Sequence, residues 1–112
     1  MATFDETFDT IKAEMTDLGI FYHEELLLAV TKSLGPSIYN TDSSRVACSD
    51  QTELDRVKNN FLIGKLGLED SPNLDDAIKE ICDHMSSANR NKYRAIFYYL
   101  LVSRFQKESL FI

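Results

Sequence analysis

Two cysteines and two histidines are the side chains of this sequence best suited to covalent chemistry. Cys48 lies at the end of a polar loop, Asp42–Asp50, just before a predicted helix start, where a thiolate is favoured. It is therefore a candidate reactive thiol. Nucleophilic catalysis also needs a base close to the thiol, and no spacing identifies His23 or His84 as that base. The competing interpretation is that Cys48 is a buried core residue, the usual place of a free cysteine.

The same four side chains could ligate a metal ion, but their spacing argues against it. Zinc sites usually contain a close pair such as Cys-x-x-Cys. The only close pair here is Cys82 and His84, which point about 200° apart on a helix. We predict no metal site and no cofactor. Because no secretory signal begins the sequence, we predict a cytoplasmic protein in which Cys48 and Cys82 are reduced.

Three basic residues cluster at the predicted start of the last helix: Arg90, Lys92 and Arg94. Positive charge opposes the helix dipole there, while free backbone N–H groups favour an anion. One hypothesis is a phosphate or carboxylate site beside the Asp42–Asp50 loop. Its candidate ligand-binding residues are Ser43, Ser44, Arg90 and Arg94. The alternative is a set of internal ion pairs with acids from residues 1–88, such as Asp42 or Asp50. In either case we expect the loop to lie near this helix start.

The charge distribution narrows the classes of partner. Residues 1–88 carry 17 acidic and 7 basic side chains, a net charge of −10, whereas residues 89–112 carry one acidic and five basic, a net charge of +4. The whole chain has a net charge of −6, which argues against nucleic-acid binding. No apolar run approaches the ~20 residues that a membrane-spanning helix needs. We therefore expect no membrane partner.

Apolar spacing and capping residues predict an all-α fold. Thr3 and Glu6 resemble a capping box, Gly19 is a typical helix end, and Ser71 followed by Pro72 is a typical start. The predicted helices are Phe4–Leu18, His23–Leu34, a third from the cap Ser49 to Gly67, a fourth from Ser71 to Met85, and Arg90–Gln106. The helix Arg90–Gln106 is apolar nearly all round, which is typical of a buried helix. We predict one compact domain, residues 1–112, with about five helices around it.

The last helix also has one predicted polar arc. Its members are Lys92, Ala95, Tyr99, Ser103 and Gln106. Leu100 lies outside this arc, so we expect it to be buried. Arg104 falls among apolar residues and either extends outward along its own stem or marks a cleft. The neighbouring aromatic residues are expected in the core rather than in a ligand cage.

Several motifs resemble a known family. They are Asp42–Asp50, Glu53-Leu54, Lys65–Leu68, Leu74–Ile78, Cys82, Met85 and Phe97–Leu101. Together they resemble the uncharacterised bacterial domain of unknown function family 2853. Thr41 stands where this family usually has a basic residue, which weakens any role for a positive charge there. The resemblance implies a small cytosolic bacterial protein and implies no reaction.

Two functions remain open from the sequence. The leading hypothesis is a non-catalytic module that binds a partner protein or a small anion. The alternative is a thiol-dependent enzyme or redox protein that uses Cys48.

Overall fold

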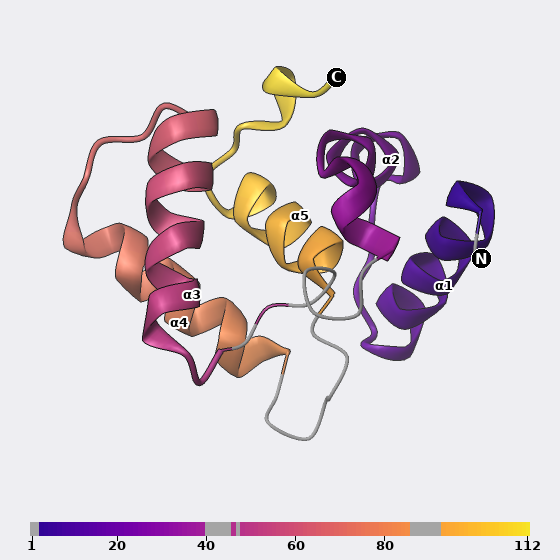
Figure 1. Cartoon of the computed structure of the whole chain (residues 1–112), viewed down its shortest axis with the longest axis horizontal. Coiled ribbons are helices and arrows are strands. Elements are labelled where there is room, and N and C mark those ends of the chain that lie inside the picture. The colour runs from indigo at the N-terminus through magenta and orange to yellow at the C-terminus, as the bar shows by residue number, and fades with distance from the viewer. Residues whose placement is uncertain (1–2, 40–45, 47, 86–92) are drawn as a thin grey trace.

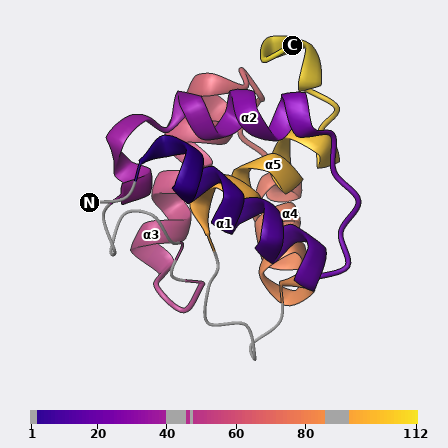
Figure 2. The same cartoon turned by 90° about the vertical axis from the view of Figure 1, so that its right-hand side faces the viewer.

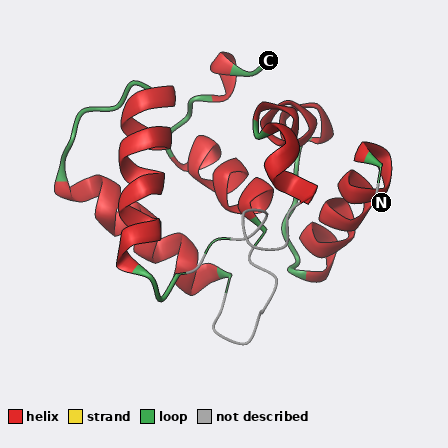
Figure 3. Cartoon of the chain, in the orientation of Figure 1, coloured by secondary structure: helices red, strands yellow, loops and turns green. Residues whose placement is uncertain are grey.

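The computed structural model describes residues 3–39, 46, 48–85 and 93–112. These residues form five α-helices, two short 3₁₀-helices and one π-helix. The α-helices are α1 (Phe4–Asp17), α2 (Glu24–Ser33), α3 (Gln51–Arg56), α4 (Pro72–His84) and α5 (Arg94–Arg104). The 3₁₀-helices are η1 (Gly35–Tyr39) and η3 (Glu108–Leu110), and the π-helix is η2 (Val57–Lys65). The described part of the chain contains no strand (Figure 3), which confirms the all-α prediction.

Helix α5 is the centre of the molecule. In Figure 1 it lies between α1 and α2 on one side and α3, η2 and α4 on the other, and Figure 2 agrees. Its buried residues are Ala95, Ile96, Phe97, Tyr98, Tyr99, Leu101 and Val102. The prediction of a buried C-terminal helix is therefore confirmed.

The predicted polar arc of α5 is wrong in two places, because other helices cover it. Ala95 and Tyr99 are buried, and the Tyr99 hydroxyl accepts a hydrogen bond from the His23 backbone N–H at 2.8 Å. Leu100 is only half-buried, whereas Leu101 is fully buried. The helix is thus even more enclosed than its composition indicates, and its most exposed apolar position is Leu100.

The ends of α5 also differ from the prediction. Tyr93 has an extended backbone and is the N-cap, so the helix begins at Arg94 rather than Arg90. Arg94 lies in its first turn, whereas Arg90 and Lys92 lie outside the described residues. The helix ends at Arg104, since Gln106 adopts a left-handed conformation with φ of 55°. No helix of the described residues is long and apolar enough to cross a bilayer.

Helices α1 and α2 begin and end close to the predicted positions. The Thr3 side chain accepts a hydrogen bond from the Glu6 N–H at 3.2 Å, which confirms Thr3 as the cap. Gly19 follows α1 with φ of +71°, a conformation that glycine adopts without strain. The core side of α1 carries Phe8, Ile11 and Met15. These three residues belong to the predicted apolar stripe.

The third predicted helix is two kinds of helix in sequence. Its cap is Asp50 rather than Ser49, because the Asp50 carboxylate accepts a hydrogen bond from the Thr52 N–H at 3.0 Å. After α3 the chain continues as the π-helix η2, and we call the continuous segment Gln51–Lys65 the α3–η2 rod. Apolar spacings of four residues fit both helix types, so the sequence did not distinguish them. The rod places Phe61 on Tyr98, with ring centroids 3.9 Å apart.

Helix α4 starts at Pro72 after the cap Ser71, as predicted. The side that faces the core is formed by Leu74, Ala77, Ile78 and Ile81. Lys58 of the rod forms an ion pair with Asp75 in α4 at 3.2 Å and another with Asp70, just before α4, at 3.0 Å. The middle of the rod is therefore attached to the start of α4 and also packs on the core.

Candidate functional site

The structure describes only part of the predicted ligand-binding set. Ser43, Ser44 and Arg90 lie outside the described residues, so an anion site that uses them stays a prediction. Arg94 is described, and its side chain is 15% exposed. Cys48, the candidate reactive thiol, is half-buried.

Arg94 is held by two groups of the same chain. Its Nη2 forms an ion pair and hydrogen bond with Glu53 Oε1 of α3, and its Nη1 donates to the Tyr98 hydroxyl at 3.0 Å. The guanidinium carbon also lies 5.6 Å from the centre of the Tyr98 ring. We call Glu53, Arg94 and Tyr98 the arginine cluster. The pairing favours the internal ion-pair interpretation for Arg94, with Glu53 as a partner that sequence reasoning had not identified.

Burial and neighbouring charges shift the pKa values of Arg94 and Tyr98 in the arginine cluster. Burial alone would lower the pKa of Arg94, but Tyr98 and Glu53 together raise it above its ordinary value. Burial raises the pKa of the Tyr98 phenol above its ordinary 10.0, although the positive charge of Arg94 opposes this rise. Arg94 is therefore a fixed positive charge and Tyr98 a neutral hydroxyl at physiological pH. The cluster stabilises the contact between α3 and α5.

The prediction of two reduced cysteines is wrong for this structure. Cys48 and Cys82 form a disulfide, with Cα atoms 6.0 Å apart and a sequence separation of 34. The prediction relied on the expected compartment, whereas the fold decides the geometry: α4 lies against the α3–η2 rod and brings Cys82 to the segment before α3. In this state Cys48 has no thiolate, so a nucleophilic role would first require reduction.

The two histidines lie at the surface, and the aromatic residues Phe97 and Tyr98 of α5 lie in the core. His23 and His84 are exposed, and among the described residues no three His, Cys, Asp or Glu side chains are placed to hold a metal ion. Phe97 and Tyr98 are buried and belong to the core. Arg104 extends outward, where its Nε lies 3.6 Å from the Glu80 carboxylate.

Among the described residues, the most exposed large apolar side chain lies in a segment that sequence reasoning passed over. Phe21, between α1 and α2, is 101% exposed, whereas Ile20 and Tyr22 on either side pack against the core. Side chains alternate in direction along an extended backbone, so burial of the two flanking residues turns Phe21 to solvent. The run Ile20-Phe21-Tyr22 between two helices was the available signal. We call Thr16–Tyr22 the α1–α2 corner.

The α1–α2 corner is held in place from both ends. The Gly19 N–H donates to the Thr16 carbonyl and the Ile20 N–H to the Met15 carbonyl, each at 3.0 Å. After the corner, the His23 N–H donates to Tyr99 of the central helix. Phe21 is therefore displayed by a backbone that α1 holds on one side and α5 on the other.

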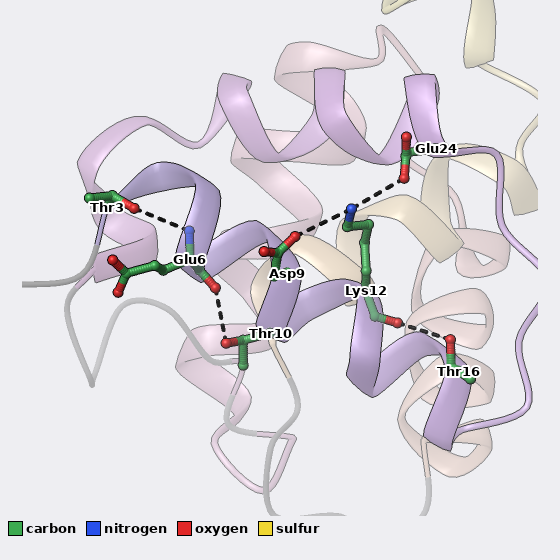
Figure 4. A network of polar contacts seen from close by, with 7 residues as sticks. All are labelled: Thr3, Glu6, Asp9, Thr10, Lys12, Thr16 and Glu24. Carbon is green, nitrogen blue, oxygen red and sulfur yellow. Dashed lines mark hydrogen bonds and ion pairs between the residues drawn. The ribbon is translucent and has the colours of Figure 1, made fainter.

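A salt bridge fixes the two helices beside the corner. Lys12 of α1 lies 3.4 Å from Asp9 and 3.3 Å from Glu24 at the start of α2 (Figure 4). The Glu24 hydrogen bond is the main cause that raises the pKa of Lys12. The single basic residue of α1 is thus already engaged by two carboxylates.

Beside Phe21 lies an open pocket of about 350 Å³. Its lining residues are Thr16, Gly19, Ile20, Phe21 and Tyr22. The acids Asp17, Glu24 and Glu25 are exposed at the two ends of the corner. Residues 3–39 carry seven acidic and two basic side chains, a net charge of −5. The corner therefore combines an apolar surface with an acidic surround.

A second cavity, of about 220 Å³, lies between α1, η1 and the start of α5. It is lined by Glu6, Thr7, Thr10, Ile11, Ile38, Tyr93 and Ala95. The charged residue in this lining is Glu6. An acid repels an anion, so this cavity does not suit the anion predicted near the start of the last helix.

Comparisons with known proteins agree with the family resemblance. A comparison with curated proteins finds no significant match. A family model described as "Protein of unknown function (DUF2853)" matches residues 10–109, which include α1 from its middle onward and all of α2, α3, α4 and α5. The chain therefore belongs to the DUF2853 family.

Proposed function

We propose that this chain is a small, non-catalytic module of the bacterial cytoplasm that binds a partner protein through the α1–α2 corner. The observation that carries the proposal is the complete exposure of Phe21. Burying a side chain of this size recovers roughly 1.5–3 kcal/mol. An exposed aromatic residue beside an apolar pocket is typical of a binding anchor.

The fixed backbone of the corner supports this role. Binding costs less when the anchor is already held in its bound geometry. The Gly19 turn and the hydrogen bond from His23 to Tyr99 supply that geometry before any partner arrives. Phe21 would enter a pocket of the partner, and an apolar side chain of the partner would fill the pocket beside it.

The charges around the corner define the partner's chemistry. Exposed Asp17, Glu24 and Glu25 lie at the two ends of the corner, and Lys12 of α1 is paired with two carboxylates. A segment with an apolar face and flanking Lys or Arg residues complements this surface, whereas an acidic segment is repelled. The proposed partner is therefore a basic, amphipathic protein segment.

Two matched helical peptides test the proposal, with identical leucine and phenylalanine positions and either lysine or glutamate at every polar position. Binding is followed by fluorescence anisotropy. We expect the lysine peptide to bind and the glutamate peptide not to bind. Phe21→Ser should weaken the lysine peptide by at least about tenfold, equivalent to ~1.4 kcal/mol. Added salt should weaken it further.

Tyr39→Ser is the matched control, because Tyr39 is another exposed aromatic residue, at 46%, outside the corner. This variant should bind the lysine peptide as the wild type does. Equal affinity of both peptides, or unchanged binding by Phe21→Ser, would contradict the proposal. Sedimentation adds a further outcome: a dimer that Phe21→Ser abolishes would assign the corner to a second copy of the chain instead.

A further inference from the structure

We propose that the Cys48–Cys82 disulfide is a thiol-exchange site, and that its reduction by a low-molecular-weight thiol such as glutathione releases the first helix of the α3–η2 rod from α4. The disulfide joins the segment two residues before the cap Asp50 to the last turn of α4. It is thus the covalent connection between the amino end of the rod and its neighbour. This inference is independent of the partner proposed for the α1–α2 corner.

The disulfide is accessible to a small thiol. Both cysteines are half-buried rather than enclosed, and the residues beside them, Ser49 and Asp83, are exposed. A structural disulfide in the core would be protected from attack by its surroundings. This one lies where the packed core ends, so a small molecule can approach a sulfur without unfolding the central helix.

The exchange proceeds in two balanced steps. A thiolate of the small thiol attacks one cysteine sulfur and forms a mixed disulfide, while the Cys48–Cys82 bond breaks and its electron pair leaves on the other sulfur, which takes up a proton. A second thiolate then attacks the mixed disulfide and frees the first cysteine. Two small thiols are oxidised to their disulfide, and the protein disulfide is reduced to two thiols.

Little else in the core holds the segment that the disulfide anchors. None of the residues from Cys48 to Arg56 is fully buried, whereas Val46 before them and Val57 after them are. Within this segment, the contacts with the rest of the fold include the Glu53 carboxylate on Arg94 and half-buried Leu54 and Cys48 against the core. Such a segment, with few apolar contacts, opens more readily than the core once its crosslink is removed.

Opening of α3 would also change the arginine cluster. Glu53 belongs to the released segment, whereas Arg94 and Tyr98 belong to the fixed central helix. Reduction is therefore expected to weaken the Glu53–Arg94 pair and to expose the guanidinium and the Tyr98 hydroxyl. The oxidation state of the two cysteines would control access to the start of α5.

Native protein equilibrated in glutathione buffers of increasing reducing strength tests the proposal. Free thiols are trapped with iodoacetamide and counted by mass spectrometry, and amide hydrogen exchange is measured on the same samples. We expect both cysteines to be labelled together. The amides of α3 should lose at least about tenfold more protection than those of Ile96–Val102, which lose only what the lower global stability removes.

The double variant Cys48→Ser, Cys82→Ser is the matched control, and its exchange pattern should reproduce that of the reduced wild type. Three results would overturn the proposal. The first is no labelling of the native protein by millimolar thiol. The second is labelling with unchanged protection of α3. The third is an equal loss of protection in α5 and α3, which would make the disulfide a brace of the whole fold.

Discussion

At the scale of residues, Arg94 shows how a charge that looks misplaced in the sequence becomes structural. A cation in the first turn of a helix opposes the helix dipole. Here the Glu53 carboxylate and the Tyr98 hydroxyl, from two different helices, both bind its guanidinium. The pair is largely shielded from water, so it contributes more than a surface ion pair.

Glu53→Gln should therefore destabilise the protein measurably. The variant keeps the size of the side chain but leaves a mostly buried guanidinium without its carboxylate, so we expect a loss of about 1.5–3 kcal/mol. Urea unfolding measures it. Glu80→Gln is the control, since its pair with Arg104 is exposed and should cost at most ~0.5 kcal/mol. Equal losses of unfolding free energy in Glu53→Gln and Glu80→Gln would show that the arginine cluster stabilises the fold no more than an exposed ion pair does.

The Tyr98 phenol predicts a pH dependence. Burial raises the pKa of Tyr98 in the folded state above the ordinary 10.0 of an unfolded chain. Its contribution to stability is fully present below pH 10.0 and is lost as the pH rises through the raised folded value, because the unfolded chain ionises first. Urea midpoints of the wild type should fall more steeply above pH 10.0 than those of Tyr98→Phe. If the urea midpoints of the wild type and of Tyr98→Phe fall in parallel with pH, the Tyr98 phenol does not contribute to this pH dependence.

At the scale of elements, α5 was the most predictable part of the chain. Eight consecutive apolar or aromatic residues, Ala95–Val102, require burial whatever surrounds them. The order of exposure within this run was not predictable. It depends on where α1, α2 and α4 lie, and these helices cover Ala95 and Tyr99 more completely than Leu100.

Leu101→Ala should be among the most damaging substitutions in α5. The side chain is fully buried, and truncation leaves a cavity in the core, so we expect a loss of about 2–5 kcal/mol. Half-buried Leu100→Ala should cost clearly less, and exposed Ser103→Ala about 0.5 kcal/mol at most. Urea midpoints of the three variants measure the order. A larger loss for Leu100→Ala than for Leu101→Ala would mean that the helix is rotated from the position described here.

The α3–η2 rod marks the limit of sequence patterns at the same scale. Val57, Phe61 and Leu62 fit an α-helical stripe, yet the backbone there is a π-helix. The apolar positions specify which side faces the core and leave the hydrogen-bond register undetermined. The stacking of Phe61 on Tyr98 depends on that register, as does the position of the rod over α5.

At the scale of the whole molecule, the disulfide was the feature that sequence reasoning predicted wrongly. The prediction of reduced cysteines relied on an expected compartment, whereas the approach of Cys48 to Cys82 is a consequence of tertiary packing between α4 and the rod. Phe21 was missed for the same reason. Its exposure follows from the inward packing of its two neighbours, which only the fold determines.

Removing the disulfide should lower the global stability. It closes a loop across 34 positions, for which the chain-entropy estimate is about 2–4 kcal/mol. Cys82→Ser should therefore unfold at lower urea than the oxidised wild type. Reductant should bring the wild type down to the same midpoint and leave Cys82→Ser unchanged. A wild type whose midpoint does not respond to reductant would contradict a stabilising role.

The central claim is that the α1–α2 corner is a binding surface for a basic, amphipathic segment. The most direct test is a map of amide chemical-shift changes in the full chain as the lysine peptide is added. We predict that the largest changes fall on Thr16, on Gly19–Tyr22 and on Glu24 and Glu25, and that they disappear in Phe21→Ser. Changes centred on the arginine cluster instead, with the corner unaffected, would contradict the account.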